Sequence, residues 1–161
     1  FTRYQKEEIA MSAREELNSK PQRYPKVMTP DEIEAMPRLE FNKGIETGIF
    51  ISQEREDARY FRQGICYAKP DHEPVNWTQA NFDESQCCLT GMIRLRVEDA
   101  SGRQVVLEAR PGEHIYLPAG YTYTLEATGI ESSFLWTSGP SNGPGIVEAP
   151  GYSKQLRALR G

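Results

Sequence analysis

The chain has 161 residues, of which 38% are hydrophobic, and this size and apolar content predict one domain with a single core. Its net charge is −4 and its basic residues are interspersed with acidic ones, which argues against a nucleic-acid partner. We also expect no membrane partner, because no stretch is long and apolar enough for a membrane span and no charged-then-apolar leader opens the chain.

The N-terminal segment predicts helices. Residues 4–18 are rich in helix-forming side chains. A stretch with two prolines then breaks this helix, and Thr29 followed by Pro30 has the pattern of an N-cap and a first helical residue. A short second helix should therefore begin at this point and run to about Met36, where Pro37 ends it.

From residue 39 the pattern changes to short apolar or alternating segments separated by turn signals. The expected strands cover residues 45–52, 58–68, 86–89, 92–98, 105–108, 115–117, 121–126 and 132–137. Residues 99–102 have the composition of a hairpin turn, residues 138–145 are too rich in glycine and proline for regular structure, and residues 153–159 predict a short helix. Short strands with frequent turns predict an all-β sandwich or barrel.

The three cysteines of the chain are Cys66, Cys87 and Cys88. Their number is odd, and the adjacent pair should point to opposite faces of a strand. This arrangement does not suggest a disulfide framework, so we expect a reducing, cytoplasmic location.

Two spacings within residues 77–124 resemble known family motifs. Glu84 precedes Gly91 by seven positions, and Gly112 begins a G-x5-P-x-G turn that leads to Tyr123 three residues later. These spacings resemble the two motifs of the RmlC-like cupin superfamily. Within it the chain looks most like the ethanolamine-utilisation Q-type cupins, which similarly have Trp-Thr before Asp-Glu, here at residues 77–78 and 83–84.

The resemblance covers residues from about 60 to 138 and implies the overall architecture. We expect an all-β protein with one cupin barrel, a double-stranded β-helix or jelly roll, over residues 41–140. Residues 1–40 would form an N-terminal helical extension and residues 141–161 a C-terminal tail. The resemblance also implies a homodimer.

Most cupin enzymes hold a divalent metal on three histidines and a glutamate, but this chain departs from that pattern. Trp77, Thr78, Gln79 and Ala80 stand where paired histidines are expected, and Tyr123 takes the last histidine position. We therefore expect no metal and no cofactor. A metal site with unusual ligands is the alternative, and His72 is expected to be a solvated loop residue.

Glu84 is the strongest catalytic candidate. If the cupin register holds, the side chains of Glu84, Gln86 and Cys88 face the barrel interior, while Asp83 and the alternate residues face away. A carboxyl group in an apolar barrel has a raised pKa, which suits a general acid or base. The equally weighted alternative is a structural carboxylate hydrogen-bonded by Tyr123 or Gln79.

Tyr123 is the second catalytic candidate, because a phenol in a dry pocket stabilises a developing oxyanion. An aromatic residue that only fills the barrel is the alternative. Further polar and aromatic side chains are expected to bind a small-molecule substrate in the barrel: Trp77, Gln79, Gln86, Cys88, Tyr116, Tyr121 and Trp136.

These residues predict a metal-independent cupin enzyme, an isomerase, cyclase or lyase, that uses acid/base chemistry on a small organic acid or carbonyl metabolite. A non-catalytic small-molecule-binding protein is the first alternative. The second comes from the resemblance, since the ethanolamine-utilisation relatives are associated with an acetate kinase activity and with microcompartments. The chain has no P-loop to support phosphotransfer.

Overall fold

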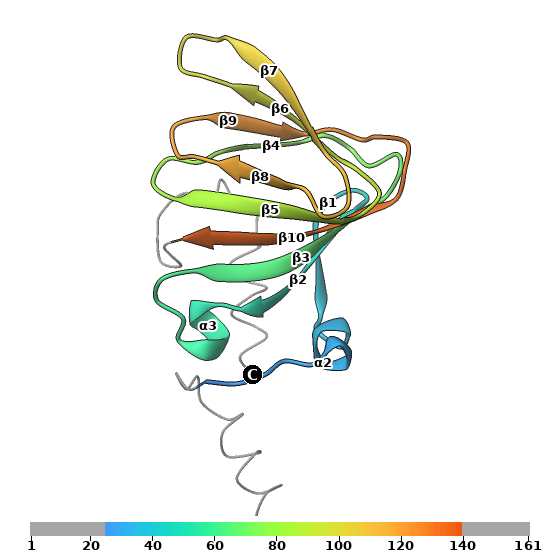
Figure 1. Cartoon of the computed structure of the whole chain (residues 1–161), viewed down its shortest axis with the longest axis vertical. Coiled ribbons are helices and arrows are strands. Elements are labelled where there is room, and N and C mark those ends of the chain that lie inside the picture. Colours follow the sequence, from blue (N-terminus) through green and yellow to red (C-terminus); the bar gives the residue numbers. More distant parts are fainter. Residues whose placement is uncertain (1–24, 140–161) are drawn as a thin grey trace, which may run out of the picture.

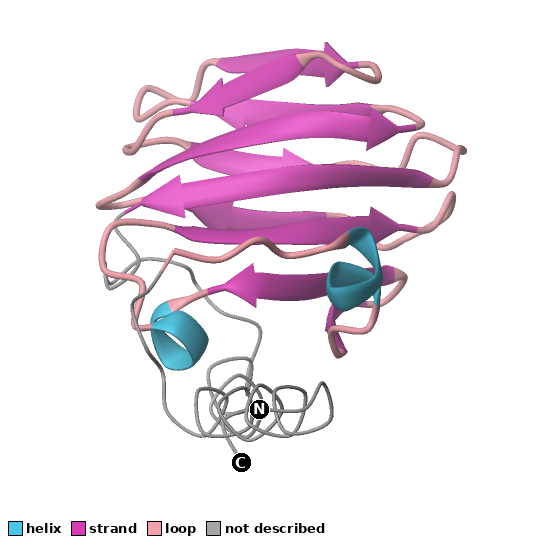
Figure 2. Cartoon of the chain, turned by 60° about the horizontal axis from the view of Figure 1, so that its bottom comes forward, coloured by secondary structure: helices cyan, strands magenta, loops and turns pink. Residues whose placement is uncertain are grey.

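The computed structural model describes residues 25–139, which form two antiparallel sheets that share one core (Figures 1 and 2). The six-stranded sheet has the order β1 (Arg38–Asn42), β2 (Ile45–Ile51), β3 (Arg62–Ala68), β10 (Ser132–Gly139), β5 (Asp83–Thr90) and β8 (His114–Leu117). The four-stranded sheet has the order β4 (Val75–Thr78), β9 (Thr122–Leu125), β6 (Ile93–Glu98) and β7 (Gln104–Ala109). The last strand, β10, lies between β3 and β5, and such crossovers give the jelly-roll topology expected from the sequence.

Most of the expected strands are confirmed, with shifted ends. The expected strand at residues 58–68 begins only at Arg62, whereas β5 begins earlier than expected, at Asp83. Strands β1 and β4 were not expected, and β10 continues to Gly139 because its residues pair with both β3 and β5. The predicted domain boundary after residue 40 falls within β1.

Two short helices accompany the sheets. Helix α2 (Pro30–Glu34) begins at the predicted cap, where the Thr29 side chain accepts a hydrogen bond from the backbone N–H of Glu32. Helix α3 (Gln53–Glu56) was not expected, and no helix of residues 25–139 is long and apolar enough to cross a membrane. The helices expected at residues 4–18 and 153–159 lie outside the described residues.

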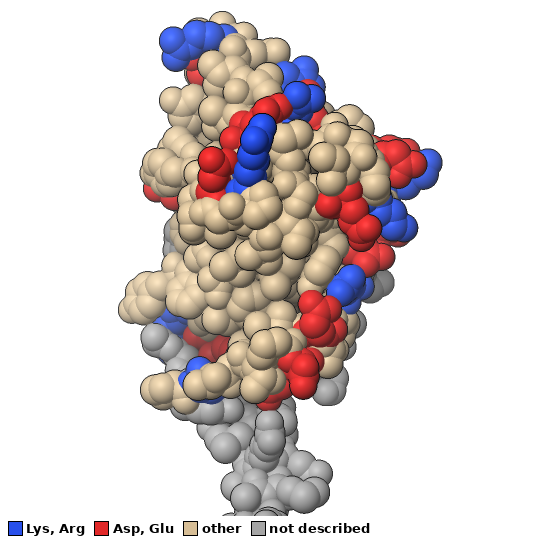
Figure 3. Space-filling model, turned by 45° about the vertical axis from the view of Figure 1, so that its right-hand side comes forward, with Lys and Arg blue, Asp and Glu red and all other residues tan. Residues whose placement is uncertain are grey.

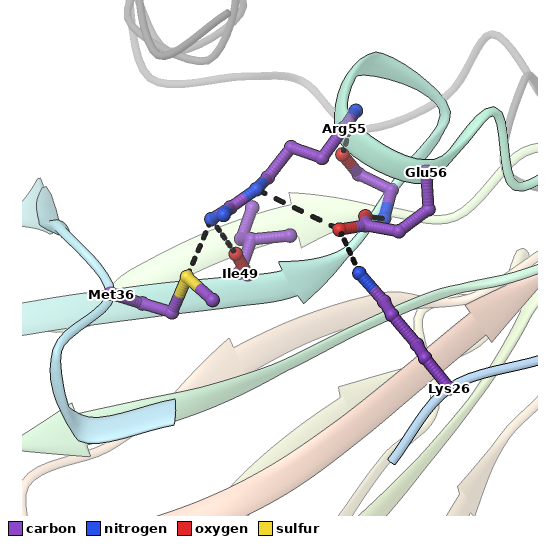
Figure 4. Close-up of polar contacts among 6 residues, drawn as sticks. Lys26, Met36, Ile49, Arg55 and Glu56 are labelled. Atoms are coloured by element: carbon purple, nitrogen blue, oxygen red, sulfur yellow. Dashed lines mark hydrogen bonds and ion pairs between the residues drawn. The ribbon is translucent and has the colours of Figure 1, made fainter. Parts of the chain in front are cut away.

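A polar cluster attaches the segment before β1 to the six-stranded sheet (Figure 4). The Arg55 guanidinium group donates to the backbone oxygen of Ile49 at 3.2 Å and contacts the Met36 sulfur at 2.7 Å. The neighbouring Glu56 carboxylate pairs with the Lys26 ammonium group at 3.1 Å. These contacts connect α3 to residues on both sides of α2, so residues 25–37 belong to the folded unit.

The inner face of β3 consists of a basic residue and three small ones, namely Arg62, Gly64, Cys66 and Ala68. The absence of a side chain at Gly64 makes room for the Trp136 ring on the neighbouring strand. A Cβ atom at Gly64 would lie 2.7 Å from both that ring and the Gly48 carbonyl oxygen. From this position the Trp136 indole Nε1 donates to the hydroxyl of Thr47 at 3.1 Å, and this bond fixes the ring inside the barrel.

Most charged side chains lie on the outside of the sheets, with Arg62 and Glu84 as exceptions that face the interior. On the face shown in Figure 3, acidic and basic residues are interspersed along the margins, around a centre made of other residues. On the outer face of β6, Arg94 pairs with Glu108 at 2.6 Å and Arg96 with Glu126 at 3.1 Å. The alternate residues of β6 point into the core, which gives this strand a clear inside and outside.

Candidate functional site

A cavity of about 80 Å³ lies inside the barrel. Its walls are mainly apolar and aromatic, and they come from both sheets: Phe41, Ile45, Thr47, Cys66, Val75, Trp77, Glu84, Gln86, Leu125, Phe134 and Trp136. Glu84 supplies the only carboxyl group among these lining residues. The cavity therefore combines apolar walls with one titratable carboxyl group, an arrangement typical of small-molecule sites.

Strand β5 carries Glu84 into this cavity. Alternate residues of the strand face inward, so Glu84 and Gln86 line the cavity, and Cys88 is buried beyond them. Asp83, in contrast, is exposed, and its carboxylate accepts hydrogen bonds from the Tyr116 hydroxyl and the Ala119 N–H. The structure thus gives β5 the inward and outward faces that the cupin register predicted.

The surroundings of Glu84 adjust its acidity. Burial raises the pKa of this carboxyl group to about 7, against the lowering effects of the Gln86 hydrogen bond and of the Arg62 positive charge. The Gln86 side-chain amide donates to Glu84 Oε1 at 2.7 Å. At this pKa both the acid and the carboxylate are populated near neutral pH, as a proton-transfer group requires.

Two polar residues that the sequence did not single out lie beside Glu84. In the six-stranded sheet Ser138 of β10 is paired with Arg62 of β3 on one side and with Glu84 of β5 on the other. Arg62 is 9% exposed and Ser138 is 2% exposed. Within the described part of the chain, neither Arg62 Nε nor Ser138 Oγ has a hydrogen-bond partner.

Gln79 lies at the same end of the barrel, in the connection between β4 and β5. Its backbone is fixed, because its N–H donates to Tyr121 at 3.2 Å and its oxygen accepts from Gly120 at 2.6 Å. Its side chain is fully buried, yet both amide atoms lack partners among residues 25–139. We call this end of the barrel interior the polar end and define it by Arg62, Gln79, Glu84, Gln86 and Ser138.

Tyr123 is buried, but its hydroxyl is already engaged. It donates to the backbone oxygen of Pro118 at 2.6 Å, and its ring lies 5.6 Å from that of Trp77. Burial and neighbouring phenol and carboxyl groups raise its pKa, so the phenol keeps its proton. Within the described residues no hydrogen bond joins Tyr123 to Glu84, so Tyr123 does not supply the hydrogen bond that the structural alternative for Glu84 assigned to it.

The other candidate residues divide between inside and outside. Trp77 and Trp136 line the cavity, whereas Cys88 is buried without lining it, and burial raises the pKa of its thiol. Tyr121 packs against the core with its ring 6.3 Å from Tyr123. Each of these residues lies within or against the core, although only the two tryptophans reach the cavity itself.

Tyr116 lies on the outer face, which corrects its expected place in the cavity wall. It is 64% exposed, because the alternation of β8 turns Ile115 and Leu117 into the core instead. Its hydroxyl donates to Asp83 at 2.8 Å. Tyr116 therefore belongs to the outer rim of the barrel.

His72 also differs from its expected state. It is buried, not solvated, and its Nδ1 lies 2.9 Å from the backbone oxygen of Glu73. The histidine packs against Gly44, where an added Cβ would come within 2.9 Å of it. His72 thus has a packing role in the loop between β3 and β4.

Sequence reasoning missed Arg62 and Ser138 because only the pairing of distant strands brings them beside Glu84. Arg62 shares a face with three small residues, and nothing local shows that this face points inward. Ser138 opens a stretch that reads as irregular because of its glycines and prolines. Both residues come together only through the register of β10 with β3 and β5.

Comparison with known proteins identifies the fold. A scan against family models and a search of curated proteins find no match. Solved structures do match, including a deletion variant of oxalate decarboxylase from Bacillus subtilis, with 15% identity, a TM-score of 0.62 and 78% of this chain covered. A tryptophan-to-phenylalanine variant of the same enzyme has 15% identity, a TM-score of 0.60 and 79% coverage of this chain.

The chain spans about a third of the length of these decarboxylase structures, 33% and 34%, and the likeness shows the fold alone. The chain has the cupin fold, as the motif spacings predicted. The EutQ protein of Clostridium difficile also matches, with 21% identity, 61% of this chain and 64% of that chain covered, and a TM-score of 0.46. That score is too low to support an argument about function.

Manganese(II) centres are described for the oxalate decarboxylase. At the cupin ligand positions Trp77 presents an indole ring and Tyr123 a protonated phenol that donates to Pro118. No group of three or more His, Cys, Asp and Glu side chains that could hold an ion occurs in residues 25–139. With Glu84 as the one charged donor, this set does not fit a divalent transition metal.

Proposed function

We propose that the barrel binds a small carbonyl compound and that Glu84 transfers a proton on it, as in a metal-independent isomerase, cyclase or lyase. The observation that carries this proposal is the position of the Glu84 carboxyl group, which faces an otherwise mainly apolar cavity. A carboxyl group costs free energy in such a place unless it has partners, and one side-chain amide, that of Gln86, donates to it. Its presence there suits a reactive group.

The proposed step is the removal of a proton from the carbon next to the carbonyl group. The Glu84 carboxylate takes the proton, the C–H bond breaks, and its electron pair moves onto the carbonyl oxygen to give an enolate. The unpartnered amide of Gln79, which is at the same end of the barrel although not among the cavity-lining residues, is the donor that we propose for that oxygen. Return of the proton to another carbon gives an isomerase, and loss of a leaving group gives a lyase.

The second candidate function is binding without turnover. It is favoured by the hydrogen bond from Tyr123 to the Pro118 carbonyl oxygen, because this bond leaves the tyrosine unavailable as a second acid. A binding protein would use the same cavity and the same polar end. The phosphotransfer implied by the resemblance has no comparable support in the polar end, and we do not propose it.

Proton transfer is tested by deuterium exchange, followed by proton NMR in D2O with 2-butanone and 2-oxobutyrate as probes. The native protein should accelerate loss of the α-proton signal of at least one probe. Glu84→Gln should lower that rate by about 10²-fold to 10⁴-fold. Glu40→Gln is the matched control, since Glu40 lies exposed on β1 and its substitution should leave the rate unchanged.

Equal exchange rates in the native protein and in Glu84→Gln would remove Glu84 from the mechanism. If the native protein accelerates exchange of neither probe but binds them, the second candidate function is preferred.

Two expectations about the whole protein stay proposals. A reducing, cytoplasmic location agrees with the three cysteines, all of which are unpaired. A homodimer is implied by the cupin resemblance, and light scattering on the full chain would test it.

A further inference from the structure

The polar end holds a buried cation, Arg62, whose Nε atom lacks a hydrogen-bond partner in the described residues. Arg62 is the only lysine or arginine among the buried residues of the described chain. Its Nε atom is closed off from solvent and donates to nothing in residues 25–139. A buried donor without a partner destabilises the fold, and more so when it is charged, so its presence requires an explanation.

Ser138 adds a second unpartnered group beside the first. It sits between Arg62 and Glu84, since these three residues occupy paired positions on β3, β10 and β5. Strands in a sheet are about 4.8 Å apart, so Arg62 and Glu84 flank the small Ser138 side chain across about 10 Å. Neither Arg62 nor Ser138 is among the residues that line the cavity, but Ser138 is the strand neighbour of Glu84, which does line it.

This pair of donors suits a carboxylate. A guanidinium group binds a carboxylate through parallel N–H···O bonds, and a serine hydroxyl donates one more. Glu84 does not fill this role, because no ion pair joins it to Arg62 within the described residues and its own hydrogen bond comes from Gln86. An incoming anion would give Arg62 and Ser138 the acceptors they lack.

The size and walls of the cavity limit the rest of the ligand. A cavity of about 150 Å³ accepts benzene, and this one measures about 80 Å³. The space next to Glu84 and Gln86 is lined by Phe134 and Trp136 and offers few polar partners. An aliphatic body fits these limits, and an aromatic ring exceeds them.

We infer that the barrel binds a short-chain aliphatic monocarboxylate of about four or five carbons. Arg62 and Ser138 bind its carboxylate, and its alkyl group packs against Trp136 and Phe134. This inference rests on the proposed function and deepens it by naming the substrate class. It assigns Arg62 and Ser138 as binding residues and leaves proton transfer to Glu84.

Calorimetry and NMR titration of the full-length protein with isobutyrate and isovalerate test the inference. Both probes should bind, and isobutyramide, the neutral analogue of isobutyrate, should bind at least about tenfold more weakly because it cannot accept the paired bonds. Phenylacetate should bind more weakly than isovalerate. Equal affinities for isobutyrate and isobutyramide would overturn carboxylate recognition, and tighter binding of phenylacetate would overturn the size limit.

Variants locate the site. Arg62→Gln should weaken isobutyrate binding about tenfold or more and abolish the preference over the amide, while Ser138→Ala should weaken it about threefold. Arg94→Gln is the matched control, because Arg94 lies on the outer face of β6. This variant should bind isobutyrate with the affinity of the native protein. Unchanged binding in folded Arg62→Gln would refute the assignment.

If Arg62→Gln does not fold, Arg62→Lys keeps the charge but loses the planar fork, and it should still weaken binding about tenfold. Retention of native affinity in that variant would equally refute the assignment.

The two proposals fail in different ways. Deuterium exchange on neutral 2-butanone without any binding of isobutyrate would refute the carboxylate site and leave proton transfer by Glu84 standing. Binding of isobutyrate in both the native protein and Glu84→Gln, with no exchange in either, would refute catalysis and leave the carboxylate site standing.

Discussion

Two serines on the same strand show how differently the two ends of the barrel interior are built. Ser132 and Ser138 both lie on β10, and both are buried, at 4% and 2% exposure. The Ser132 hydroxyl accepts from the Met92 N–H at 3.1 Å and lies within hydrogen-bond distance of the Met92 and Ile130 carbonyl oxygens. The Ser138 hydroxyl has no partner among the described residues.

The difference separates an end whose buried hydroxyl is fully hydrogen-bonded from the polar end, for which we propose a function. At the Ser132 end the hydroxyl holds the corner where β5 leads into β6, and Gly91 in this corner has a φ of +70°. An added Cβ there would collide with the backbone of Glu131, so only glycine fits. At the polar end the buried groups are positioned by the sheet but not saturated, which leaves them available to a ligand.

The largest expected effect tests the boundary between the two ends, where Trp136 lies across Gly64. Gly64→Ala should destabilise the protein by about 3 kcal/mol, because the new methyl group meets the ring and the Gly48 carbonyl oxygen. Gly48→Ala is the matched control, since a Cβ there meets Met36 at an ordinary 4.0 Å and the stability should change little. Urea unfolding measures both, and equal losses would show that Gly64 has no special role.

The next effect depends on pH and concerns Glu84 at the polar end. The folded pKa of Glu84 is raised from 4.5 to about 7, so the native protein loses stability as pH rises through this window. The glutamine of Glu84→Gln does not titrate. The stability of this variant relative to the native protein should therefore increase by about 2 kcal/mol as the pH rises from 4.5 to 7, with allowance for partial solvent screening. Thermal unfolding across this pH range measures the difference, with Glu40→Gln as control.

A stability difference that stays constant with pH would show that the Glu84 carboxyl group has an ordinary environment. The polar end would then lose its strongest distinction from the Ser132 end.

The two serines themselves give a direct comparison. Ser132→Ala should cost about 2 kcal/mol, because it leaves the Met92 N–H and nearby carbonyl groups without their partner. Ser138→Ala removes a buried hydroxyl that bonds to nothing described, so its free energy of unfolding should not fall and should rise by up to about 1 kcal/mol. Denaturant titrations measure both free energies of unfolding. A clear loss of stability in Ser138→Ala would show that the Ser138 hydroxyl has a structural role.

The smallest effect concerns the hydroxyl that positions Trp136. Thr47→Val keeps the shape of the side chain but leaves the buried indole N–H of Trp136 without its acceptor, and it should cost about 1 kcal/mol. Thr78→Val removes an exposed hydroxyl and serves as the control. A change in tryptophan fluorescence in Thr47→Val but not in Thr78→Val would support a role of the Thr47 hydroxyl in positioning Trp136. An unchanged free energy of unfolding in Thr47→Val would contradict that role.

Much of the fold could be predicted from the sequence, because its signals are local. Gly91 and the turn around Gly120 have positive φ angles that glycine tolerates, and their spacing marks the corners of a cupin barrel. The alternation of β5 placed Glu84 and Gln86 inside for the same reason, since side chains of a strand alternate between its faces. The Thr29 cap of α2 is likewise encoded within a few residues.

The candidate site was only partly predictable. The role expected for Tyr123 depended on where its hydroxyl points, and the nearby Pro118 carbonyl oxygen takes that hydroxyl. Tyr116 was expected inside, but the alternation of β8 turns it outward. The first outcome depends on three-dimensional distances that spacing along the chain does not encode, whereas the second follows from the same two-residue alternation that placed Glu84 inside.

By itself, the sequence determined the fold class, the corners of the barrel and the inward position of Glu84, because these follow from backbone conformation and the two-residue period of strands. Only the tertiary structure decided that Arg62 and Ser138 join Glu84. These residues lie on three strands far apart in the chain, and the pairing register of β10 brings them together. The raised pKa of Glu84 is decided there too, since burial depends on what all strands place around one carboxyl group.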